Sequence, residues 1–390
     1  DANGKLRPVS GHAYDVGAAD TTPQVTESEA VELATRAARG VEGLRVSTRL
    51  VLVPNALIAD DGRARGATLA YQVSFAGEGL AAVRGQEIFV DARTGAIAWR
   101  FNAGRHASGI GYGRYVGRAT IETTEYEEGK YRLENPNAGG SEVRDAGDVQ
   151  VEEGEVFLNE NANIWGDSSH TDRVTPGVDA HASVSAAWRY FSERHGHVGA
   201  DGAGTKITTY VHFGSGYNNA AGGNNVIVVG EGDGVTRGSF ASVDVMAHEF
   251  THSVVQYTAG LPYAGEPGAI DEAMSDIFGT AVEFYANNDP DYLIGEDVVR
   301  SGVPGDAFRD MANPTIDHLS KKLYTSGCSP AFDESGEPTN DYCGVHSNSG
   351  IVNKAFHLLA VGGEHPVSGI TVHEIGREAA EDIFFVALTR

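Results

Sequence analysis

The sequence is poor in several residue types, and each shortage excludes a class of protein. Only two of its 390 residues are cysteine, too few for a disulfide-dense scaffold or for a zinc site built from cysteines. Lysine and arginine number 29 against 54 aspartates and glutamates, giving a formal net charge of −25. This charge argues against binding to nucleic acid or to anionic membranes. No run of apolar residues is long enough to cross a membrane.

The rest of the composition is that of a globular protein with more than one domain. Hydrophobic residues make up 41% of the chain, and its length is ample for two or three domains with cores of their own. The acidic charge suits a soluble secreted protein with calcium-binding carboxylates, although adaptation to high salt would give the same balance. Because the chain starts at Asp1 without an initiator methionine or a signal peptide, we expect a fragment of a longer precursor.

A short motif in the second half of the chain has the spacing of a zinc site. In the stretch His248-Glu-Phe-Thr-His252, two imidazoles four residues apart lie on one face of a helix. The pattern H-E-x-x-H is typical of zinc peptidases, in which the glutamate, here Glu249, acts as general base on a metal-bound water. The alternative is an amphipathic helix that packs in a core and whose histidines bind no metal.

A third ligand is available on a second predicted helix. A catalytic zinc needs three protein ligands and one open position, and Glu272 can supply the third. Gly260 can end the first helix and Pro267 can begin the second, so the chain has room to turn back toward the histidines. Asp276 lies four residues after Glu272, on the same helix face, and can accept a hydrogen bond from a ligand imidazole.

The stretch from His248 to Asp276 resembles the active-site region of the thermolysin-like neutral zinc metallopeptidases, the M4 family, in which HExxH is followed by Gly-Ala-x-x-Glu-x-x-Ser-Asp. The similarity runs from about Gly109 to the last residue. It implies a β-rich N-terminal lobe over 106–255, which includes the HExxH helix, and a helical C-terminal lobe over 256–390, with zinc between them. The family's closing helices would follow the last residue, so we expect a truncated helical lobe.

The first 105 residues resemble a separate module. A short amphipathic helix begins near Ser28, and alternation over 70–75 and 86–91 predicts strands, with a further strand after the turn that follows. This order resembles the PepSY module of propeptides in the same family. It implies that 1–105 is a propeptide segment acting as intramolecular inhibitor and chaperone; a generic domain is the alternative. The polar stretch 102–109 is predicted to be a linker and processing site. The predicted fold class is α+β.

The resemblance assigns further catalytic roles by matched motifs. Tyr263 corresponds to a tyrosine that binds the oxyanion, and His346 to a second catalytic histidine. Asp341 corresponds to the carboxylate that orients this histidine. The two cysteines, Cys328 and Cys343, bracket the polar loop before it and can form a disulfide that stiffens the loop, or stay as unpaired thiols. Closing a loop of this length contributes about 3 kcal/mol in the chain-entropy model.

Substrate and calcium contacts are implied in the same way. Asn219 and Ala220 match residues that hydrogen-bond the substrate backbone, although the aromatic residues usual after them are missing, which puts the non-primed rim in doubt. Arg309 matches an arginine that binds a substrate carbonyl. The apolar pocket for the residue after the scissile bond is predicted to contain Val245, Ile294, Val298 and Phe308. Calcium is predicted at Asp244, Glu283, Asp291 and Glu296, with Leu293 in place of a further glutamate, so one ion is expected.

The function that the resemblance implies is that of a secreted, monomeric zinc endopeptidase, which cuts proteins or peptides on the amino side of bulky hydrophobic residues and is made as an inhibited proenzyme. Two alternatives remain. An HExxH aminopeptidase would carry a motif that recognises a free amino terminus, and none is found. A non-catalytic or latent peptide-binding relative would have lost its base first, whereas Glu249, His346 and Tyr263 are all in place.

Overall fold

The computed structural model describes residues 21–37, 45–55, 66–76, 86–102, 105–127, 129–159, 162–303, 305–324, 328–333 and 338–390. Within it the chain divides into two compact units, Asp1–Arg105 and His106–Arg390. Each unit has its own hydrophobic core. The described helices include none that is both long enough and apolar enough to span a bilayer.

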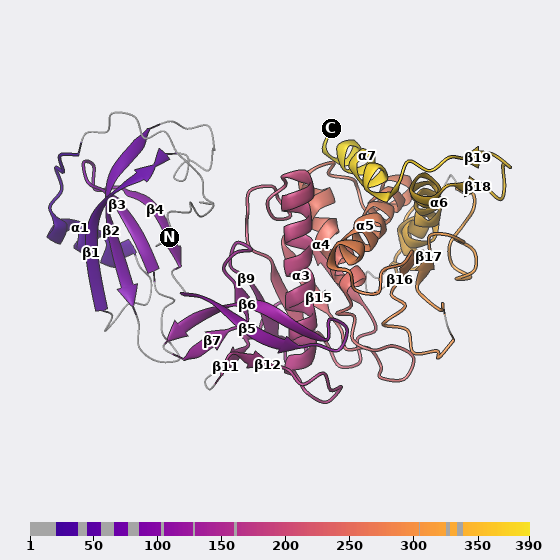
Figure 1. Ribbon diagram of the computed structural model, residues 1–390, viewed down its shortest axis with the longest axis horizontal. Helices are drawn as coiled ribbons and strands as arrows, with labels where there is room; N and C mark the ends of the chain where they lie inside the picture. Colours follow the sequence, from indigo (N-terminus) through magenta and orange to yellow (C-terminus); the bar gives the residue numbers. More distant parts are fainter. Residues whose placement is uncertain are drawn as a thin grey trace, which may run out of the picture. The chain divides into compact units, whose positions relative to one another are not determined.

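The first unit is one helix on a four-stranded antiparallel sheet (Figure 1). Helix α1 (Glu27–Ala37) begins with a capping pair, because the Thr26 hydroxyl and amide both donate to the carboxylate of Glu29. Its small buried residues, Ala30 and Ala34, allow it to lie close against the sheet. The predicted helix and strands are confirmed. The strands follow chain order: β1 (Arg45–Pro54), β2 (Ala67–Ala76), β3 (Gln86–Asp91) and β4 (Ile97–Asn102).

The predicted joint between the two units is shorter than the sequence suggested. Strand β4 continues to Asn102, and β5 (Arg105–Tyr112) already begins three residues later. Residues 103–104 of the predicted linker lie outside the described residues. The remainder, 105–109, was predicted as part of the linker but lies in strand β5, and its role as a processing site stays a prediction. Its histidine and serine face the carboxylate of Glu122 on the neighbouring strand, so pairing within the sheet accounts for their polarity.

The second unit begins with two β-sheets that pack around one long helix. Helix α3 (Val174–His195) contacts strands of both sheets along one side and the next helix along the other (Figure 1). One sheet has the order β11-β7-β6-β5-β12, and the other β10-β9-β13-β15-β14 with β8 beside β9. Their bounds are β6 (Arg118–Glu127), β7 (Lys130–Arg132), β8 (Glu134–Asn135), β9 (Ser141–Asp145), β10 (Glu155–Val156), β11 (Leu158–Asn159), β12 (Ile164–Trp165), β13 (Thr208–Val211), β14 (Ala220–Gly223) and β15 (Val226–Val229).

Helices form the rest of this unit. Helix α4 (Val243–Tyr257) packs against α3 and β14, and α5 (Gly265–Ala286) packs against α4. Helices α6 (Asp341–Val361) and α7 (Arg377–Thr389) follow, and α6 also packs on α5. Two short antiparallel strand pairs lie in the loops between these helices: β16 (Leu293–Ile294) with β17 (Arg309–Asp310), and β18 (Gly363–Glu364) with β19 (Thr371–Val372). The result is a β-rich part followed by a helical part.

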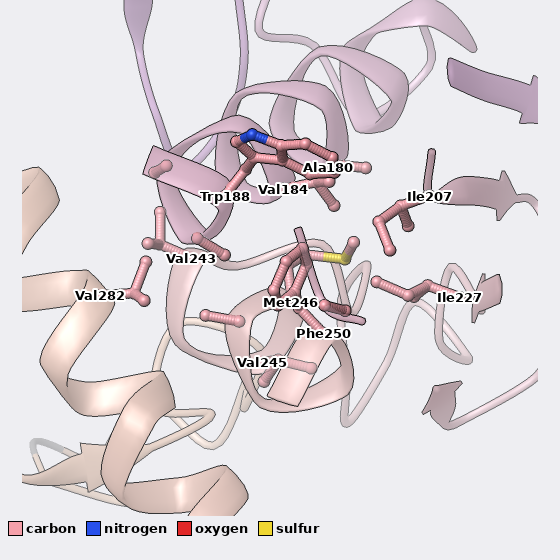
Figure 2. Close-up of a cluster of buried hydrophobic side chains, with 14 of the residues drawn as sticks. Ala180, Val184, Trp188, Ile207, Ile227, Val243, Val245, Met246, Phe250 and Val282 are labelled. Carbon is pink, nitrogen blue, oxygen red and sulfur yellow. The ribbon is translucent and has the colours of Figure 1, made fainter. Parts of the chain in front are cut away.

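The largest core lies where α3, α4 and α5 meet the second sheet (Figure 2). Trp188 of α3, Met246 and Phe250 of α4, and Ile227 of β15 point into it and are nearly or fully buried. Burying side chains of this size stabilises the fold by about 1.5–3 kcal/mol each. Helix α4 is buried along most of its length and packs against α3 and β14 as well as against α5. These contacts hold its polar residues in a defined position between the β-rich part and the helical part.

Candidate metal centre and active site

Two packed helices bring the three predicted zinc ligands together. His248 and His252 lie on α4 and Glu272 on α5, and their nearest ligand atoms are all within 4.8 Å of one another. Each imidazole Nε2 lies 3.5 Å from a carboxylate oxygen of Glu272, and the two Nε2 atoms are 3.1 Å apart. The close approach of the helices depends on Gly279, where a Cβ atom would lie 2.8 Å from the backbone oxygen of Asp244.

Each histidine is held by a carboxylate at its other ring nitrogen. Asp276 lies 2.9 Å from Nδ1 of His248. The sequence analysis expected this carboxylate beside a ligand imidazole. Asp271 lies 2.7 Å from Nδ1 of His252, and the sequence prediction missed this contact. Such carboxylates fix the tautomer and the ring orientation of a metal-binding histidine. The only sequence signal for Asp271 was its position directly before Glu272, which by itself would place it on a different helix face.

The charges around the histidines fit a divalent cation. Burial lowers the pKa of His252, but its hydrogen bond to Asp271 and the charges of Glu272 and Glu249 outweigh burial and raise this pKa to about 9. For Glu272 the effects are the opposite: burial alone would raise its pKa, but the charges of the surrounding histidines and of Arg309 lower it to about 2. The carboxylates of Glu272, Glu249 and Asp271 thus surround the histidines with negative charge that a bound cation would offset. Two nitrogens and a carboxylate, each oriented by neighbours, are a donor set suited to zinc.

The metal-binding group opens onto a cavity of about 1420 Å³. Glu249, which is 7% exposed, lines it beside the ligands. Across the cavity, the Tyr263 hydroxyl donates to a carboxylate oxygen of Glu272 and lies 3.4 Å from Nε2 of His346. Burial and the nearby charge of Glu272 raise the pKa of Tyr263, so its hydroxyl keeps its proton. The structure thus brings Glu249, Tyr263 and His346 into the same cavity as the three predicted zinc ligands.

His346 is positioned by an unusual stretch of backbone at the start of α6. Asp341, Tyr342, Cys343 and Gly344 all have positive φ values, between 46° and 77°, and only then does the right-handed helix begin. This left-handed turn directs Oδ1 of Asp341 to within 2.5 Å of Nδ1 of His346. Burial lowers the pKa of His346, but the charge of Glu272 and this hydrogen bond raise it above its ordinary value.

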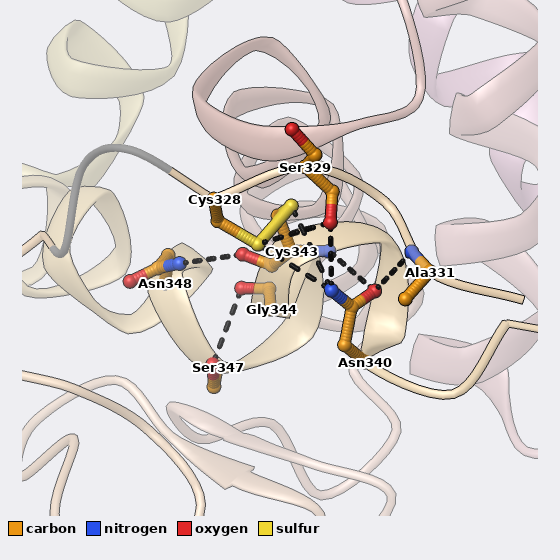
Figure 3. Close-up of a disulfide and its surroundings, with 8 residues drawn as sticks. All are labelled: Cys328, Ser329, Ala331, Asn340, Cys343, Gly344, Ser347 and Asn348. Atoms are coloured by element: carbon orange, nitrogen blue, oxygen red, sulfur yellow. Dashed lines mark hydrogen bonds between the residues drawn. A yellow bond between two sulfur atoms is a disulfide. The ribbon is translucent and has the colours of Figure 1, made fainter.

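A disulfide and an asparagine side chain hold the left-handed turn in place. Cys328 and Cys343 form a disulfide, which confirms the predicted pairing over two free thiols. The Asn340 side chain accepts from the Cys343 amide and donates to the carbonyl oxygen of Ser329 at 2.9 Å, tying the turn to the segment before it (Figure 3). Both connections act on the residues just before His346, so the loop that orients this histidine is fixed at two points.

Arg309 lines the cavity but is bound on its other side. Its guanidinium donates two hydrogen bonds to Asp276, at 2.7 and 2.5 Å, and the side-chain amide of Asn353 donates to the same carboxylate at 2.7 Å. The carboxylate of Asp276 therefore contacts both Arg309 and the metal-binding His248. Burial would raise the pKa of Asp276, but the charge of Arg309 and the contact with His248 lower it, so this carboxylate stays ionised.

An apolar pocket lies beside Arg309. Val245, Ile294 and Phe308 line the cavity as predicted, and the ring of Phe240, which the prediction omitted, stacks on Phe308 with centroids 5.5 Å apart. Val298 was predicted with them, but it is fully buried and is not among the residues that line the cavity in the described part of the chain, so its place in the pocket wall stays a prediction. Val298 packs in the main hydrophobic core instead.

The opposite rim of the cavity is an edge strand. Asn219 and Ala220 both line the cavity, and Ala220 begins β14, which pairs on one side only, with β15. An edge strand leaves backbone groups free to pair with an extended peptide. Gly222 of the same strand lies against the backbone of Glu249, where a Cβ atom would come within 2.1 Å of its carbonyl oxygen. The strand can therefore lie directly on the helix that carries the metal ligands.

A second group of side chains, separate from the three zinc ligands, could also hold a metal ion. Glu283, Asp291 and Glu296 offer carboxylate oxygens within 4.8 Å of one another. Burial and repulsion by Asp244 raise the pKa of Glu283 to about 10 and that of Glu296 to about 8, so a bound cation would favour their ionised forms. Such a set of oxygens fits calcium. Asp244 is close, but its two oxygens accept from the Ser242 hydroxyl and the Gly295 amide, so its own role as a ligand stays a prediction.

Comparison with known proteins gives consistent matches. The family model described as the thermolysin metallopeptidase catalytic domain matches residues 108–256, and that of its alpha-helical domain matches residues 259–390. The chain is 40% identical over 363 residues to the thermostable neutral protease NprT of Geobacillus stearothermophilus. It is 38% identical over 365 residues both to a bacillolysin of Bacillus caldolyticus and to a thermolysin of Alicyclobacillus acidocaldarius.

These matches cover the two chains unequally. In each case 87% of this chain is aligned, but only 61% of the relative, so the chain spans about three-fifths of the length of these proteins. Among solved structures, a precursor of protealysin, a metalloproteinase from Serratia proteamaculans, aligns with a TM-score of 0.48 and 28% identity. That alignment covers 64% of this chain and 74% of the other.

Proposed function

The chain belongs to the thermolysin family of metallopeptidases, and from this premise we propose that it is a zinc-dependent endopeptidase, secreted and made as an inhibited proenzyme. The observation that carries the proposal is the convergence of His248, His252 and Glu272 beside Glu249 in one cavity. A zinc ion bound there would polarise the substrate carbonyl and lower the pKa of a bound water toward about 7.

Glu249 is proposed as the general base. It follows the first ligand on α4 and lines the cavity, so its carboxylate can accept a proton from the attacking water and pass it to the nitrogen of the leaving amine. Tyr263 and His346 converge from the other side, with the hydroxyl 3.4 Å from Nε2 of the imidazole. We assign them as donors to the negative charge that develops on the carbonyl oxygen. Asp341 orients the imidazole through its Nδ1 atom.

The substrate is proposed to lie extended along β14, bonded by the backbone at Asn219 and Ala220. Arg309 has its guanidinium held by Asp276 and can donate to a substrate carbonyl without a large loss of side-chain entropy. The apolar pocket of Val245, Ile294, Phe308 and Phe240 would take the side chain after the scissile bond, so bulky hydrophobic residues are favoured there. The substrates are proteins or peptides.

The three-part organisation is also a proposal. Residues 1–105 form a unit of their own, a helix on a four-stranded sheet, which supports a PepSY-like propeptide acting as chaperone and intramolecular inhibitor. The β-rich lobe is assigned to 106–255 and the helical lobe to 256–390. One calcium at Glu283, Asp291 and Glu296, with Asp244 beside them, would neutralise the acidic group. The disulfide suits an extracellular, oxidising compartment, and a monomer is expected.

The experiment is a time course of intact mass with zinc and calcium, run beside Glu249→Gln. The expected result is a cut between about Phe101 and Ile110 in the wild-type chain while the variant stays whole, because only the wild type keeps the base. If both chains are cut alike, a contaminating protease is responsible. If neither is cut, a blocked peptide with a central leucine is added in trans. Failure of that cleavage as well would overturn the proposed endopeptidase activity.

A further inference from the structure

The cavity contains a positive charge that the proposed mechanism does not use. Arg237 lines the cavity, and its guanidinium carbon lies 4.6 Å from the centroid of the Phe308 ring, one wall of the apolar pocket. Within the described part of the chain this guanidinium has no carboxylate partner. The other arginines of the cavity differ: Arg309 is neutralised by Asp276, and Arg300 donates to the backbone oxygen of Gly234. In a chain with 54 acidic and 29 basic residues, an unpaired arginine in the cavity calls for an explanation.

The backbone of Arg237 is fixed, so its side chain has a defined position. Its amide donates to the carboxylate of Asp233, and its carbonyl oxygen accepts from the amide of Gly234. It also forms an isolated antiparallel bridge with Val299. Asp233 is the nearest acidic residue in sequence, but its carboxylate is occupied by backbone amides and by the hydroxyl of Thr236 at 2.6 Å. The guanidinium thus lies in the lining of the cavity, with one face on an aromatic ring and no carboxylate partner among the described residues.

This arrangement is suited to a carboxylate. A guanidinium stacked on a ring keeps the donors at its edge, and two parallel donors match the two oxygens of a carboxylate. Stacking on Phe308 also reduces the entropy that the side chain would lose on pairing. In an extended peptide each residue advances the chain by about 3.3 Å and successive side chains point to opposite faces. A residue next to the one in the apolar pocket, or one further on, can therefore reach the rim where Arg237 lies.

We propose that Arg237 is a specificity-determining residue that binds a carboxylate of the substrate within two residues of the side chain in the apolar pocket. The proposal rests on the proposed peptidase function, since it assigns a preference to the same cavity. The carboxylate can belong to a glutamate or aspartate side chain or to the free C-terminus of a short peptide. Because Arg237 is partly exposed, we expect the pair to favour an acidic peptide by about two- to fivefold at low salt.

The test uses the full chain loaded with zinc and calcium and two readouts. Peptides with a leucine after the scissile bond carry either glutamate or glutamine at the next position or the one after, all with amidated C-termini. Affinity is measured by fluorescence anisotropy on Glu249→Gln, which binds without cutting, and kcat/KM is measured on the wild type. We expect glutamate to be preferred, and the preference to shrink at 0.5 M NaCl. A glutamine peptide with a free C-terminus, compared with its amide, distinguishes a terminal carboxylate from a side chain.

Two substitutions make the test specific to this residue. Arg237→Met keeps an extended apolar side chain over Phe308 and removes the charge, so the preference for glutamate should vanish or reverse, given the net charge of −25. Arg189→Met removes the same charge from an exposed position on α3 outside the cavity lining and should leave the preference unchanged. An equal response to glutamate and glutamine peptides in the wild type, or a preference that persists in Arg237→Met, would overturn the proposal.

The outcome also distinguishes this proposal from the proposed function. Peptides that bind Glu249→Gln with an arginine-dependent preference, but that the wild type does not cut, would leave the carboxylate site standing and overturn the peptidase. Peptides that the wild type cuts without any preference for glutamate would support the peptidase and overturn the carboxylate site at Arg237. If no peptide is bound or cut, both proposals fail.

Discussion

The carboxylate of Asp341 lies 2.5 Å from Nδ1 of His346, although the two residues are five positions apart at the start of one helix. In a regular α-helix such residues do not face each other, because neighbours on one face are three or four apart. They meet here because residues 341–344 form a left-handed turn. A left-handed conformation costs about 1–2 kcal/mol for each non-glycine residue, so the surrounding contacts must stabilise it.

We predict that Asp341→Asn lowers kcat by about 10- to 100-fold, the usual effect of removing a carboxylate that orients a functional histidine. The amide can still accept a hydrogen bond, but it no longer balances the charge of an imidazolium. Steady-state kinetics on a peptide substrate measures the change. The free energy of unfolding should hardly change, because Asp341 is partly exposed. A loss of stability as large as the loss of activity would contradict a positioning role.

Breaking the disulfide should affect the same loop. We predict that Cys328→Ser with Cys343→Ser lowers the free energy of unfolding by at most about 3 kcal/mol, the chain-entropy value for a loop of this length. Activity should fall as well, because the left-handed turn before His346 loses one of its two anchors. Urea unfolding and peptide cleavage measure the two effects, and bound zinc measured in parallel should stay at one per chain. Full activity in the double variant would show that the Asn340 contacts suffice.

Gly279 sets the distance between the helices that carry the metal ligands. In Gly279→Ala the new Cβ atom would lie 2.8 Å from the backbone oxygen of Asp244, so α4 and α5 must move apart. We expect a loss of about 1–3 kcal/mol in the free energy of unfolding and weaker zinc binding in a competition titration. Gly223→Ala is the matched control, since its Cβ atom would meet only the end of the Gln256 side chain, at 3.8 Å. If both variants behave alike, helix spacing is not limiting.

Calcium should stabilise the chain through its buried carboxylates. At a free calcium concentration of 100 times Kd, binding contributes about 2.7 kcal/mol to the free energy of unfolding. In Glu283→Gln this calcium-dependent rise should largely disappear, because an amide is a weaker ligand. In excess EGTA the variant should be more stable than the wild type, since a neutral amide avoids the cost of burying the Glu283 carboxylate and its repulsion by Asp244 and Glu296. Thermal unfolding with calcium and with EGTA tests both, and Glu266→Gln, exposed on the same helix, should leave the calcium response unchanged.

His181 should make the fold sensitive to acid. It lies on α3, is 3% exposed and bonds the backbone oxygen of Glu122, and burial lowers its pKa from 6.5 to about 4. Between these values the unfolded chain binds the proton more readily than the folded one, so stability is fully present above about pH 6.5 and falls as the pH drops toward 4. The loss from this group approaches about 3 kcal/mol.

The measurement is urea unfolding of the wild type and His181→Gln at pH 7 and pH 4.5. Glutamine can donate to the same carbonyl oxygen but does not titrate, so the variant should lose less stability between the two pH values. Subtracting the stability loss of the variant from that of the wild type leaves the part due to His181, because the carboxylates that also titrate in this range are common to both chains. Equal losses in both chains would contradict the prediction.

The zinc site was predictable because its information is local. Helical periodicity puts His248 and His252 on one face whatever the rest of the chain does. A second helix, beginning near Pro267 after the break at Gly260, places Glu272 and Asp276 on one face as well. The helix and strands of the first unit could likewise be predicted from short stretches, one amphipathic with helical spacing and the others alternating between apolar and polar residues. The roles of Tyr263, His346 and Arg309 came from family resemblance, and they stay predictions until tested.

Contacts between segments far apart in the chain could not be predicted from the sequence. Nothing in the sequence around Asp271 shows that it meets His252, and nothing around Arg237 shows that it lies on Phe308. Val298 has the same apolar character as Ile294, yet only one of them reaches the cavity. By itself the sequence determined which residue types stand at helical or strand spacing, because that depends on backbone geometry over a few residues. Only the tertiary structure decided which side chains meet, because burial and packing depend on how distant segments come together.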